Sequence, residues 1–468
     1  MTPDPWRMGY HLMPPTGWLN DPNGLCQFRG TYHFFHQWSP EWPTPHARRG
    51  WGHYSSEDLV HWTHHGMALD QDSPADANGA YSGGAIVLPG AAPDGGDLLR
   101  LYYTGNVKEP GDHDYVYEGR GANEILVESA DGFDLGEKNV LLANEDYPAW
   151  SSCHVRDPKV WVEDGCYHML LGMRTVEDMG MMLVYRSADG YRWALEGLVG
   201  PDTKLGYMWE CPDRIVLDGH EYVACCPQGV SDMPWSDGVD DHAGYFCVGA
   251  GQRVVDSAVV AADSFTRWDN GFEFYAPQSF VDDSGRTILV GWIGMPEASW
   301  VGQPESLDWI HCLTVPRVLS RCDDWRIAQW PAAEIESLRG ESIDLAGGSA
   351  TLAEHRADIV ATGIQGSFSI TLDGALAISG DARGCQVAFA DDAVACGRTS
   401  RRVDLEPLHD LRILVDSSVV EVFANGGRMV FSTRWFPTAE GLSVTVSGAR
   451  ESAVAYPMAD VMATIYSD

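Results

Sequence analysis

Pairs of short β-rich runs joined by glycine turns recur along the first two thirds of this chain. The turns follow one another at intervals of 65, 70, 54 and 66 residues and centre on Gly30, Gly95, Gly165, Gly219 and Gly285. Asp-Gly between two such runs is a strong hairpin signal, and helical periodicity is nearly absent. Divergent units of this length predict a β-propeller with five four-stranded blades. A two-sheet sandwich is the alternative, but the first ~310 residues are more than one sandwich needs.

The character of the sequence changes after Pro316-Arg317. Tryptophan becomes sparse beyond Trp330, and small residues alternate with Val, Ile and Leu. Asn425-Gly426, which follows the β-rich run 419–424, predicts a two-residue hairpin turn. We therefore expect a propeller over 1–317, a connecting segment over 318–334 and a β-sandwich over 335–468. The expected fold class is all-β, a five-bladed β-propeller followed by a C-terminal β-sandwich.

Charge and cysteine content exclude several classes of protein. The chain has 31 Lys and Arg against 67 Asp and Glu, a formal net charge of −36, which repels nucleic acid and anionic membranes. No apolar run approaches the ~18 residues of a membrane helix. Eleven cysteines without a C-x-x-C pair argue against a disulfide framework and a zinc ribbon. Because no signal peptide precedes the first motif, we expect a cytoplasmic protein with reduced thiols.

The first candidate site is the motif Trp18-Leu19-Asn20-Asp21-Pro22-Asn23-Gly24. Pro22 fixes its own φ and donates no backbone hydrogen bond, so it presents the Asp21 carboxylate from a stiff strand end. The neighbouring asparagines can donate hydrogen bonds, and Trp18 offers an apolar face to a sugar ring. The alternative is an Asx-turn, in which Asp21 only caps backbone groups.

Two further acidic motifs accompany the first. In Arg156-Asp157-Pro158 a proline again follows the acid, and Arg156 would keep Asp157 ionised. In Trp209-Glu210-Cys211-Pro212-Asp213 the glutamate has apolar or weakly polar neighbours, and desolvation there would raise its pKa, as a general acid requires. The alternatives are a salt bridge in a turn for Asp157 and a buried pair with Arg214 for Glu210.

The turn repeat predicts that these motifs meet. Asp21 and Glu210 each lie nine residues before their turn glycine, and Asp157 lies eight residues before its own. Ser82 and Tyr275 lie thirteen and ten residues before theirs. The first strands of propeller blades line the central channel, so all five should reach one mouth of it. Three carboxylates among aromatic side chains describe a glycosidase better than a metal site, and we expect no metal ion and no cofactor.

The three motifs, in this order, resemble the signature of the β-fructofuranosidases of glycoside hydrolase family 32, which include invertases and sucrose-6-phosphate hydrolases. The resemblance covers nearly the whole chain and continues through His33-Phe34-Phe35-His36-Gln37, Trp51-Gly52-His53, Tyr81-Ser82-Gly83, Tyr275-Ala276-Pro277-Gln278-Ser279-Phe280, Gly291-Trp292, Val315-Pro316-Arg317 and Val420-Glu421-Val422-Phe423.

This resemblance implies hydrolysis of terminal β-fructosides with retention, in a five-bladed propeller with an attached β-sandwich. Asp21 is similar to the nucleophile, Glu210 to the acid/base, and Asp157 to the carboxylate that holds fructose hydroxyls and steadies the transition state. The residues expected to line the fructose pocket or contact the substrate are Asn20, Gln37, Trp42, Ser82, Arg156, Tyr275 and Trp292. The implied substrates are sucrose, sucrose 6-phosphate and short fructo-oligosaccharides.

Two positions depart from the family pattern. His36 stands where the family usually has tyrosine, and the segment 43–50 differs from the expected shorter loop. Arg48 and Arg49 in that segment either contact a substrate phosphate or are solvated surface charges. A fructosyltransferase and a non-catalytic fructan-binding protein are the competing functions. The sequence does not indicate the oligomeric state.

Overall fold

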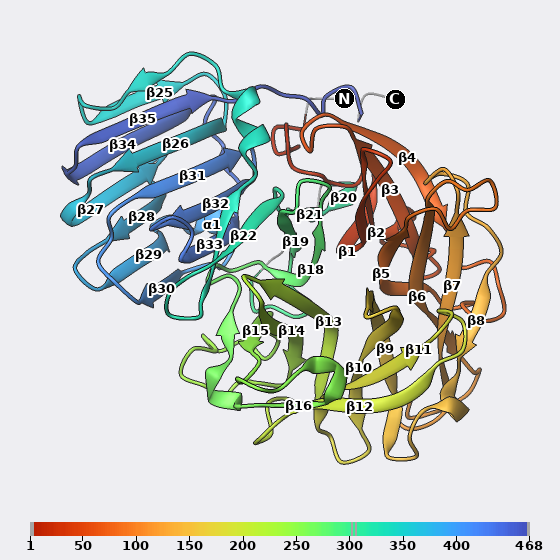
Figure 1. The fold of residues 1–468 in the computed structure, drawn as a ribbon. Coiled ribbons are helices and arrows are strands. Elements are labelled where there is room, and N and C mark those ends of the chain that lie inside the picture. The colour runs from red at the N-terminus through yellow and green to blue at the C-terminus, as the bar shows by residue number, and fades with distance from the viewer. Residues whose placement is uncertain (1–3, 301–302, 305–306, 466–468) are drawn as a thin grey trace.

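The structure, a computed structural model, describes residues 4–300, 303–304 and 307–465, so the outermost limits of the two expected domains lie outside the described residues. The chain is 52% strand and 4% helix, which confirms the all-β prediction. Figure 1 shows two parts: N-terminal sheets grouped around a centre, and a two-layered C-terminal part beside them. The N-terminal part is a propeller and the C-terminal part a β-sandwich.

The N-terminal sheets are meanders of sequential antiparallel strands, some with a short strand from elsewhere added. The first two sheets contain β1 (Gly17–Phe28), β2 (Thr31–Ser39), β3 (Gly50–Ser56), β4 (Trp62–Leu69) and β20 (Trp309–Ile310), and then β5 (Ala80–Leu88), β6 (Leu98–Lys108), β7 (Arg120–Ser129) and β8 (Asn139–Leu142). The next two contain β9 (Ser151–Glu163), β10 (Cys166–Thr175), β11 (Gly180–Ser187), β12 (Ala194–Pro201) and β16 (Ala258–Val260), and then β13 (Met208–Leu217), β14 (His220–Gln228), β15 (Gly244–Cys247) and β17 (Thr266–Arg267). The last contains β18 (Tyr275–Val281), β19 (Thr287–Ile293), β21 (Cys312–Leu313), β22 (Arg317–Arg321) and β23 (Ile327–Pro331).

All five predicted turns join the first two strands of a sheet. In three of them the glycine and the residue before it both have positive φ: Arg29-Gly30, Asp164-Gly165 and Asp218-Gly219. Two consecutive positive φ values define the type I′ turn, whose twist matches that of the flanking strands. The spacing of the turn glycines therefore correctly predicted the positions of these hairpins.

The first strands of these sheets form a closed ring. β1 contacts β5, β5 contacts β9, β9 contacts β13, β13 contacts β18, and β18 contacts β1. The ring is also closed by hydrogen bonds, because β20 adds to the first sheet in parallel with the start of β1, where Gly17 pairs with Trp309. The strands that carry the acidic motifs are thus next to one another around one centre.

Each first strand has an irregularity at the same place. The register with the second strand slips between Leu19 and Pro22, Ala80 and Gly83, Arg156 and Lys159, Glu210 and Asp213, and Tyr275 and Gln278. In β9, β13 and β18 the slip consists of a residue with positive φ, namely Asp157, Cys211 or Ala276, followed by proline. A bulge re-aims side chains, and a proline within it leaves no unpaired N–H donor.

The C-terminal part packs two antiparallel sheets around an apolar core. One sheet contains β24 (Ile343–Asp344), β35 (Ser452–Pro457), β26 (Arg356–Thr362), β31 (Leu411–Asp416), β32 (Val419–Ala424) and β33 (Met429–Arg434). The other contains β25 (Ser349–Leu352), β34 (Leu442–Ala449), β27 (Gln365–Leu372), β28 (Leu376–Gly380), β29 (Gly384–Phe389) and β30 (Ser400–Asp404). Its one-turn helix is α1 (Asp392–Ala395), and the 3-10 helices of the chain are η1 (Asn144–Asp146), η2 (Val254–Asp256), η3 (Ala262–Ser264) and η4 (Ala333–Leu338).

Two expectations about this half need correction. The hairpin at Asn425 exists, but Ala424 pairs with Met429, so its loop has four residues rather than two. The Asn425 amide is held by Glu406 and the backbone of Pro407, which keeps it out of the strand. The expected connection 318–334 is mostly strand, because β22 and β23 extend the sheet of β18 and β19.

Two sequence motifs meet where the sandwich packs on the propeller. Fully buried Arg317 contacts the Glu421 carboxylate and pairs with Asp269 at 3.1 Å. His11 lies between Glu421 and Asp416, with its two ring nitrogens 2.8 and 2.9 Å from their carboxylate oxygens. Each buried charge therefore has partners, which a low-dielectric interior requires. These motifs join the two parts of the chain and do not reach the candidate site.

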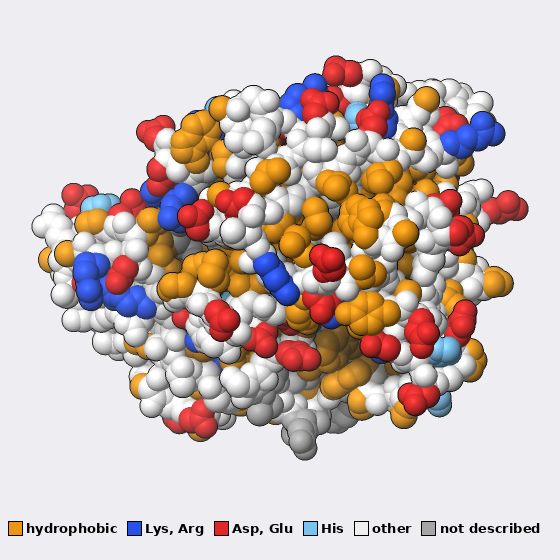
Figure 2. Space-filling view, turned by 90° about the horizontal axis from the view of Figure 1, so that it is seen from below, with side chains coloured by type: hydrophobic (Ala, Val, Ile, Leu, Met, Phe, Trp, Pro, Cys, Tyr) orange, Lys and Arg blue, Asp and Glu red, His pale blue; other side chains and the backbone are white. Residues whose placement is uncertain are grey.

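The surface agrees with the composition. On the face shown in Figure 2, Asp and Glu side chains are scattered among neutral and hydrophobic ones and do not form a single block. All eleven cysteines are free thiols. Within the described ranges, no helix has both the length and the apolar character needed to cross a bilayer.

Candidate active site

A cavity of about 550 Å³ opens at the ring of first strands. It is lined by all ten residues that the sequence predicted: Asn20, Asp21, Gln37, Trp42, Ser82, Arg156, Asp157, Glu210, Tyr275 and Trp292. They come from segments that are up to 272 residues apart in the chain. Some of these residues lie at or beside the register slip of a first strand, and the bulge there turns them toward the cavity. The others lie on a neighbouring strand or loop.

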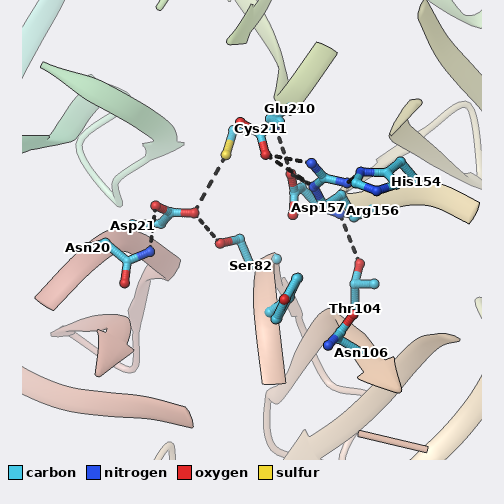
Figure 3. A network of polar contacts seen from close by, with 12 residues as sticks. Asn20, Asp21, Ser82, Thr104, Asn106, His154, Arg156, Asp157, Glu210 and Cys211 are labelled. Carbon is cyan, nitrogen blue, oxygen red and sulfur yellow. Dashed lines mark hydrogen bonds and ion pairs between the residues drawn. The ribbon is translucent and has the colours of Figure 1, made fainter. Parts of the chain in front are cut away.

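Asp21 lies in the bulge of β1, inside the strand rather than at its end. The Asn20 amide donates to one carboxylate oxygen at 2.9 Å, and the Ser82 hydroxyl donates to the other at 2.5 Å. Figure 3 shows Asp21 facing Ser82 and the Cys211 thiol across the cavity. Burial raises the pKa of Asp21, while the bonds from Ser82 and Asn20 oppose this shift. The carboxylate is held by donors on both oxygens, so the Asx-turn alternative does not apply.

Asp157 is only 5% exposed. Its backbone N–H donates to the Thr104 hydroxyl at 2.9 Å, and its carboxylate accepts from the Cys211 N–H at 2.9 Å. Burial raises the pKa of Asp157 to about 7; Arg156 opposes this shift and the nearby Glu210 carboxylate adds to it. Arg156, whose Nε lies 3.8 Å from the Asp157 carboxylate, favours the ionised form as expected, but burial outweighs its effect on the pKa.

Arg156 instead pairs with Glu210. Its Nη2 lies 2.6 Å from Glu210 Oε1, and the Tyr275 hydroxyl donates to Oε2 at 2.7 Å. The Glu210 carboxylate thus contacts a charge and a hydroxyl, where the sequence predicted apolar neighbours. The alternative partner, Arg214, binds Glu221 and Glu163 instead. Figure 3 shows Arg156 reaching back to Glu210 with Asp157 beside them.

The three carboxylates influence one another. The charge of Glu210 raises the pKa of both Asp21 and Asp157, in addition to burial, and that of Asp21 raises the pKa of Asp157. Arg156 is the cation that contacts Glu210 and Asp157. Carboxylates that repel one another in a buried site retain a proton at a higher pH than isolated ones do. This cluster can therefore carry a proton near neutral pH, which is what acid/base chemistry requires.

Aromatic rings form one wall of the cavity. Trp18 packs against Trp42 and Trp292, with ring centroids 5.8 and 6.3 Å apart. The Trp18 indole N–H donates to Asn20 at 3.1 Å, which ties this wall to the residue that holds Asp21. Gln37 in β2 donates to the Ala80 carbonyl at 2.7 Å and fixes the start of the next first strand. Apolar faces beside directed polar groups suit a sugar ring.

Arg120, His154 and Tyr81 are among the lining residues that were not predicted individually. Arg120, at the start of β7, lies 2.7 Å from one ring nitrogen of His154, and Arg156 lies 2.8 Å from the other. The Tyr81 hydroxyl is 3.5 Å from Arg120. Because side chains alternate along a strand, the spacing of His154 and Arg156 in β9 already indicated one shared face. Nothing in the sequence around Arg120 indicated that it reaches this cavity.

Arg48 and Arg49 have different environments. Arg48 bridges Glu41 and Asp70, each at 2.7 Å, and does not line the cavity. Arg49 does line it, and in the described parts of the chain its guanidinium has no ion-pair or hydrogen-bond partner. Among the same residues, no group of three or more His, Cys, Asp and Glu side chains is arranged to hold a metal ion.

Comparisons with known proteins identify the family of this chain. Residues 11–331 match the model of the glycosyl hydrolases family 32 N-terminal domain, and residues 379–459 match the family 32 C-terminal model. The chain is 36% identical over 465 residues to the sucrose-6-phosphate hydrolase of Salmonella typhimurium, covering 96% of this chain and 92% of that protein.

Solved structures give the same result. The structure of sucrose-6-phosphate hydrolase from Lactobacillus gasseri superposes with a TM-score of 0.86 at 27% identity, covering 98% of this chain and 94% of that one. A mutant GH32 β-fructofuranosidase of Bombyx mori in complex with sucrose superposes with a TM-score of 0.79 at 27% identity, covering 97% and 94%. From its family models and relatives, the chain belongs to glycosyl hydrolase family 32 and is a glycoside hydrolase.

Proposed function

We propose that this chain is a retaining β-fructofuranosidase that hydrolyses the terminal β-D-fructofuranosyl bond of sucrose, sucrose 6-phosphate or short fructo-oligosaccharides. One observation carries the proposal: Asp21, Asp157 and Glu210, from bulges of three first strands, line one tryptophan-walled cavity. The names of the relatives, sucrose-6-phosphate hydrolase and β-fructofuranosidase, support this substrate class.

The proposed reaction is a double displacement without metal or cofactor. Asp21 attacks the anomeric carbon of fructose while Glu210 protonates the glycosidic oxygen, and the leaving group departs. Glu210 then removes a proton from water, and the resulting hydroxide releases fructose from Asp21. The donors on both oxygens of Asp21 support this role, because they orient the carboxylate without a competing cation.

The proton for the first step would come from the carboxylate cluster. The free enzyme holds Glu210 against Arg156, while the pKa of Asp157 is raised to about 7, chiefly by burial. We propose that this proton passes from Asp157 to Glu210 when substrate hydroxyls bind to Asp157. Asp157, once ionised, then stabilises the positive charge that develops on the fructosyl ring. Tyr275 and Arg156 keep Glu210 oriented in both steps.

Two structural expectations belong to this proposal. We propose that the sheets built on β1, β5, β9, β13 and β18 are five blades around the cavity, supported by their closed ring of contacts. We place the end of the catalytic domain near Pro331, after β23, and the start of the sandwich domain near residue 335. Eleven free thiols support a reducing compartment, and we propose the cytoplasm.

A substrate panel tests the function. Purified enzyme is given sucrose, sucrose 6-phosphate, short fructo-oligosaccharides, inulin and levan, and the products are identified. We expect fructose and the matching leaving group, with little transfer product at high sucrose. Fructosyl transfer and non-catalytic fructan binding are not favoured, because these relatives are named as hydrolases or fructofuranosidases. Mainly oligomeric products, or no turnover of any fructoside, would contradict the proposal.

Early-time NMR tests the stereochemistry. If Asp21 is the nucleophile, the first fructose released is the β-furanose, before mutarotation, because two inversions restore the original configuration. α-Fructofuranose as the first product would exclude the double displacement and leave Asp21 as a general base. Measurements on sucrose and on an activated aryl fructoside should give the same stereochemical result, since both pass through the same intermediate.

A further inference from the structure

A side pocket of about 320 Å³ opens from the active-site cavity. The two share Pro45, Ala47 and Arg49 as lining residues. The whole lining of the side pocket consists of Pro45, His46, Ala47, Arg49, Gln71, Asn78, Asn106 and Lys108. It contains two cations, amides and a histidine but no carboxylate. In a chain of net charge −36, a pocket with this lining selects for an anion.

Both cations are free to bind a ligand. The Arg49 guanidinium has no partner among the described residues, and the Lys108 ammonium lies 5.0 Å from the Tyr115 ring without a carboxylate partner. The backbone around them is fixed: Gln71 accepts the Arg49 N–H at 3.0 Å, and Asn78 accepts the Lys108 N–H at 2.7 Å. Two fixed segments therefore present positive charge to one pocket. Arg48, next in sequence, is neutralised by two carboxylates.

The side chains between the two cavities carry more hydrogen-bond donors than acceptors. Arg120 lines the active-site cavity and donates to the Asn106 side chain at 2.9 Å, and Asn106 lines the side pocket. His154 lies between Arg120 and Arg156, one at each ring nitrogen. A neutral imidazole accepts at only one nitrogen, so one of these arginine donors has no acceptor there. A row of guanidinium donors thus leads from Glu210 past Arg156 and Arg120 toward the side pocket.

This arrangement fits the leaving group of the proposed reaction. The leaving group, which is glucose in sucrose, departs on the side of the acid Glu210, and Arg156, which contacts Glu210, begins the row of donors. A phosphate on that glucose would need guanidinium and ammonium partners, which bind phosphate by charge-assisted hydrogen bonds. We propose that the side pocket binds the phosphate of a phosphorylated leaving group through Arg49 and Lys108, with Arg120 at its border. The proposal rests on the fructosidase function above.

The test compares sucrose with sucrose 6-phosphate. We expect Arg49→Ala and Lys108→Ala each to lower kcat/KM on sucrose 6-phosphate by about 30-fold, the effect of one charge-assisted bond, and on sucrose by less than about threefold. Arg48→Ala is the matched control, because this neighbouring arginine is outside both cavities. It should change both substrates by the same factor. Equal losses on both substrates in Arg49→Ala and Lys108→Ala would overturn the proposal.

A binding measurement separates the phosphate pocket from the reaction. Glucose 6-phosphate and glucose are titrated by calorimetry into the Asp21→Ala protein, with and without Arg49→Ala. We expect glucose 6-phosphate to bind more tightly than glucose, and Arg49→Ala to remove this difference. Equal binding of the two sugars by the Asp21→Ala protein would overturn the phosphate pocket even if fructosides are hydrolysed. Selective binding of the phosphate without turnover of any fructoside by the wild type would contradict only the proposed function.

Discussion

His11, buried where the propeller meets the sandwich, provides a test of how the two parts are held together. Each of its ring nitrogens faces a carboxylate, Asp416 on one side and Glu421 on the other. Burial lowers the pKa of His11, but the bonds to Asp416 and Glu421 outweigh it and raise the pKa from 6.5 to about 9. The imidazolium can donate to both carboxylates, whereas the neutral ring can donate to only one.

The shift gives the size and the sign of the effect. A rise from 6.5 to about 9 corresponds to roughly 3 kcal/mol of folding free energy at ~1.36 kcal/mol per pKa unit. Because the folded pKa is the higher one, this contribution is complete below the unfolded value of 6.5 and is lost as pH rises through about 9. With an unfolding entropy of ~2.1 cal/mol/K per residue, the 468-residue chain should lose about 3 °C in Tm.

The assay is the Tm of wild type and His11→Gln at pH 6 and pH 9.5. We expect the Tm of wild type minus the Tm of His11→Gln to be about 3 °C larger at pH 6 than at pH 9.5. His61→Gln is the control, because the His61 side chain is 61% exposed and pairs with Asp58 at the surface. Exposed ion pairs contribute little to stability, so the Tm of this variant should differ little from that of wild type at either pH. A His11→Gln difference that is the same at both pH values would refute the assignment of a charged His11.

Three predictions concern the site itself. Asp21→Ala should fold, by circular dichroism, yet retain less than about 1% of wild-type turnover, since no covalent intermediate can form. Glu210→Gln should lose ~10²–10⁴-fold in kcat on sucrose but far less on an aryl fructoside with a good leaving group; equal losses would argue against the acid role. Since Asp157, whose pKa is raised to about 7, holds the proton proposed for the first step, kcat/KM on sucrose should fall as pH rises through that value, and Asp157→Asn should remove this limb of the profile. An unchanged alkaline limb in Asp157→Asn would assign it to another group.

The sequence predicted where the site lies because its turn residues mark the ends of the first strands. Glycine turns mark where a first strand ends, and counting back from them locates Asp21, Asp157 and Glu210 on equivalent strands. The sequence could not predict which side chains pair with each other across the ring of first strands. Arg156 is the neighbour of Asp157 in sequence but pairs with Glu210, 54 residues away, because the bulge turns Asp157 toward Thr104 and Cys211.

Short strands from distant segments were also beyond prediction. β20 and β21 have two residues each and carry no recognisable period, so only the packing of the ring defines them. The segment 318–334 was expected to be a connection because the character of the sequence changes after Pro316-Arg317, yet β22 and β23 complete the sheet of β18. Composition follows the burial of side chains and does not report which backbone groups pair.

The pairing of β20 with the start of β1 has a consequence for the order in which activity arises. Gly17, four residues before Asp21, pairs with Trp309, so the strand that carries the proposed nucleophile gains its second neighbour only near the end of the propeller. During synthesis the early part of the chain would expose this strand edge, and Tyr275 and Trp292 would not yet exist. A nascent chain would thus be unable to cleave sugar until almost all of its catalytic part has been made. A ribosome-bound chain ending before residue 309 should be inactive even though all three carboxylates are present.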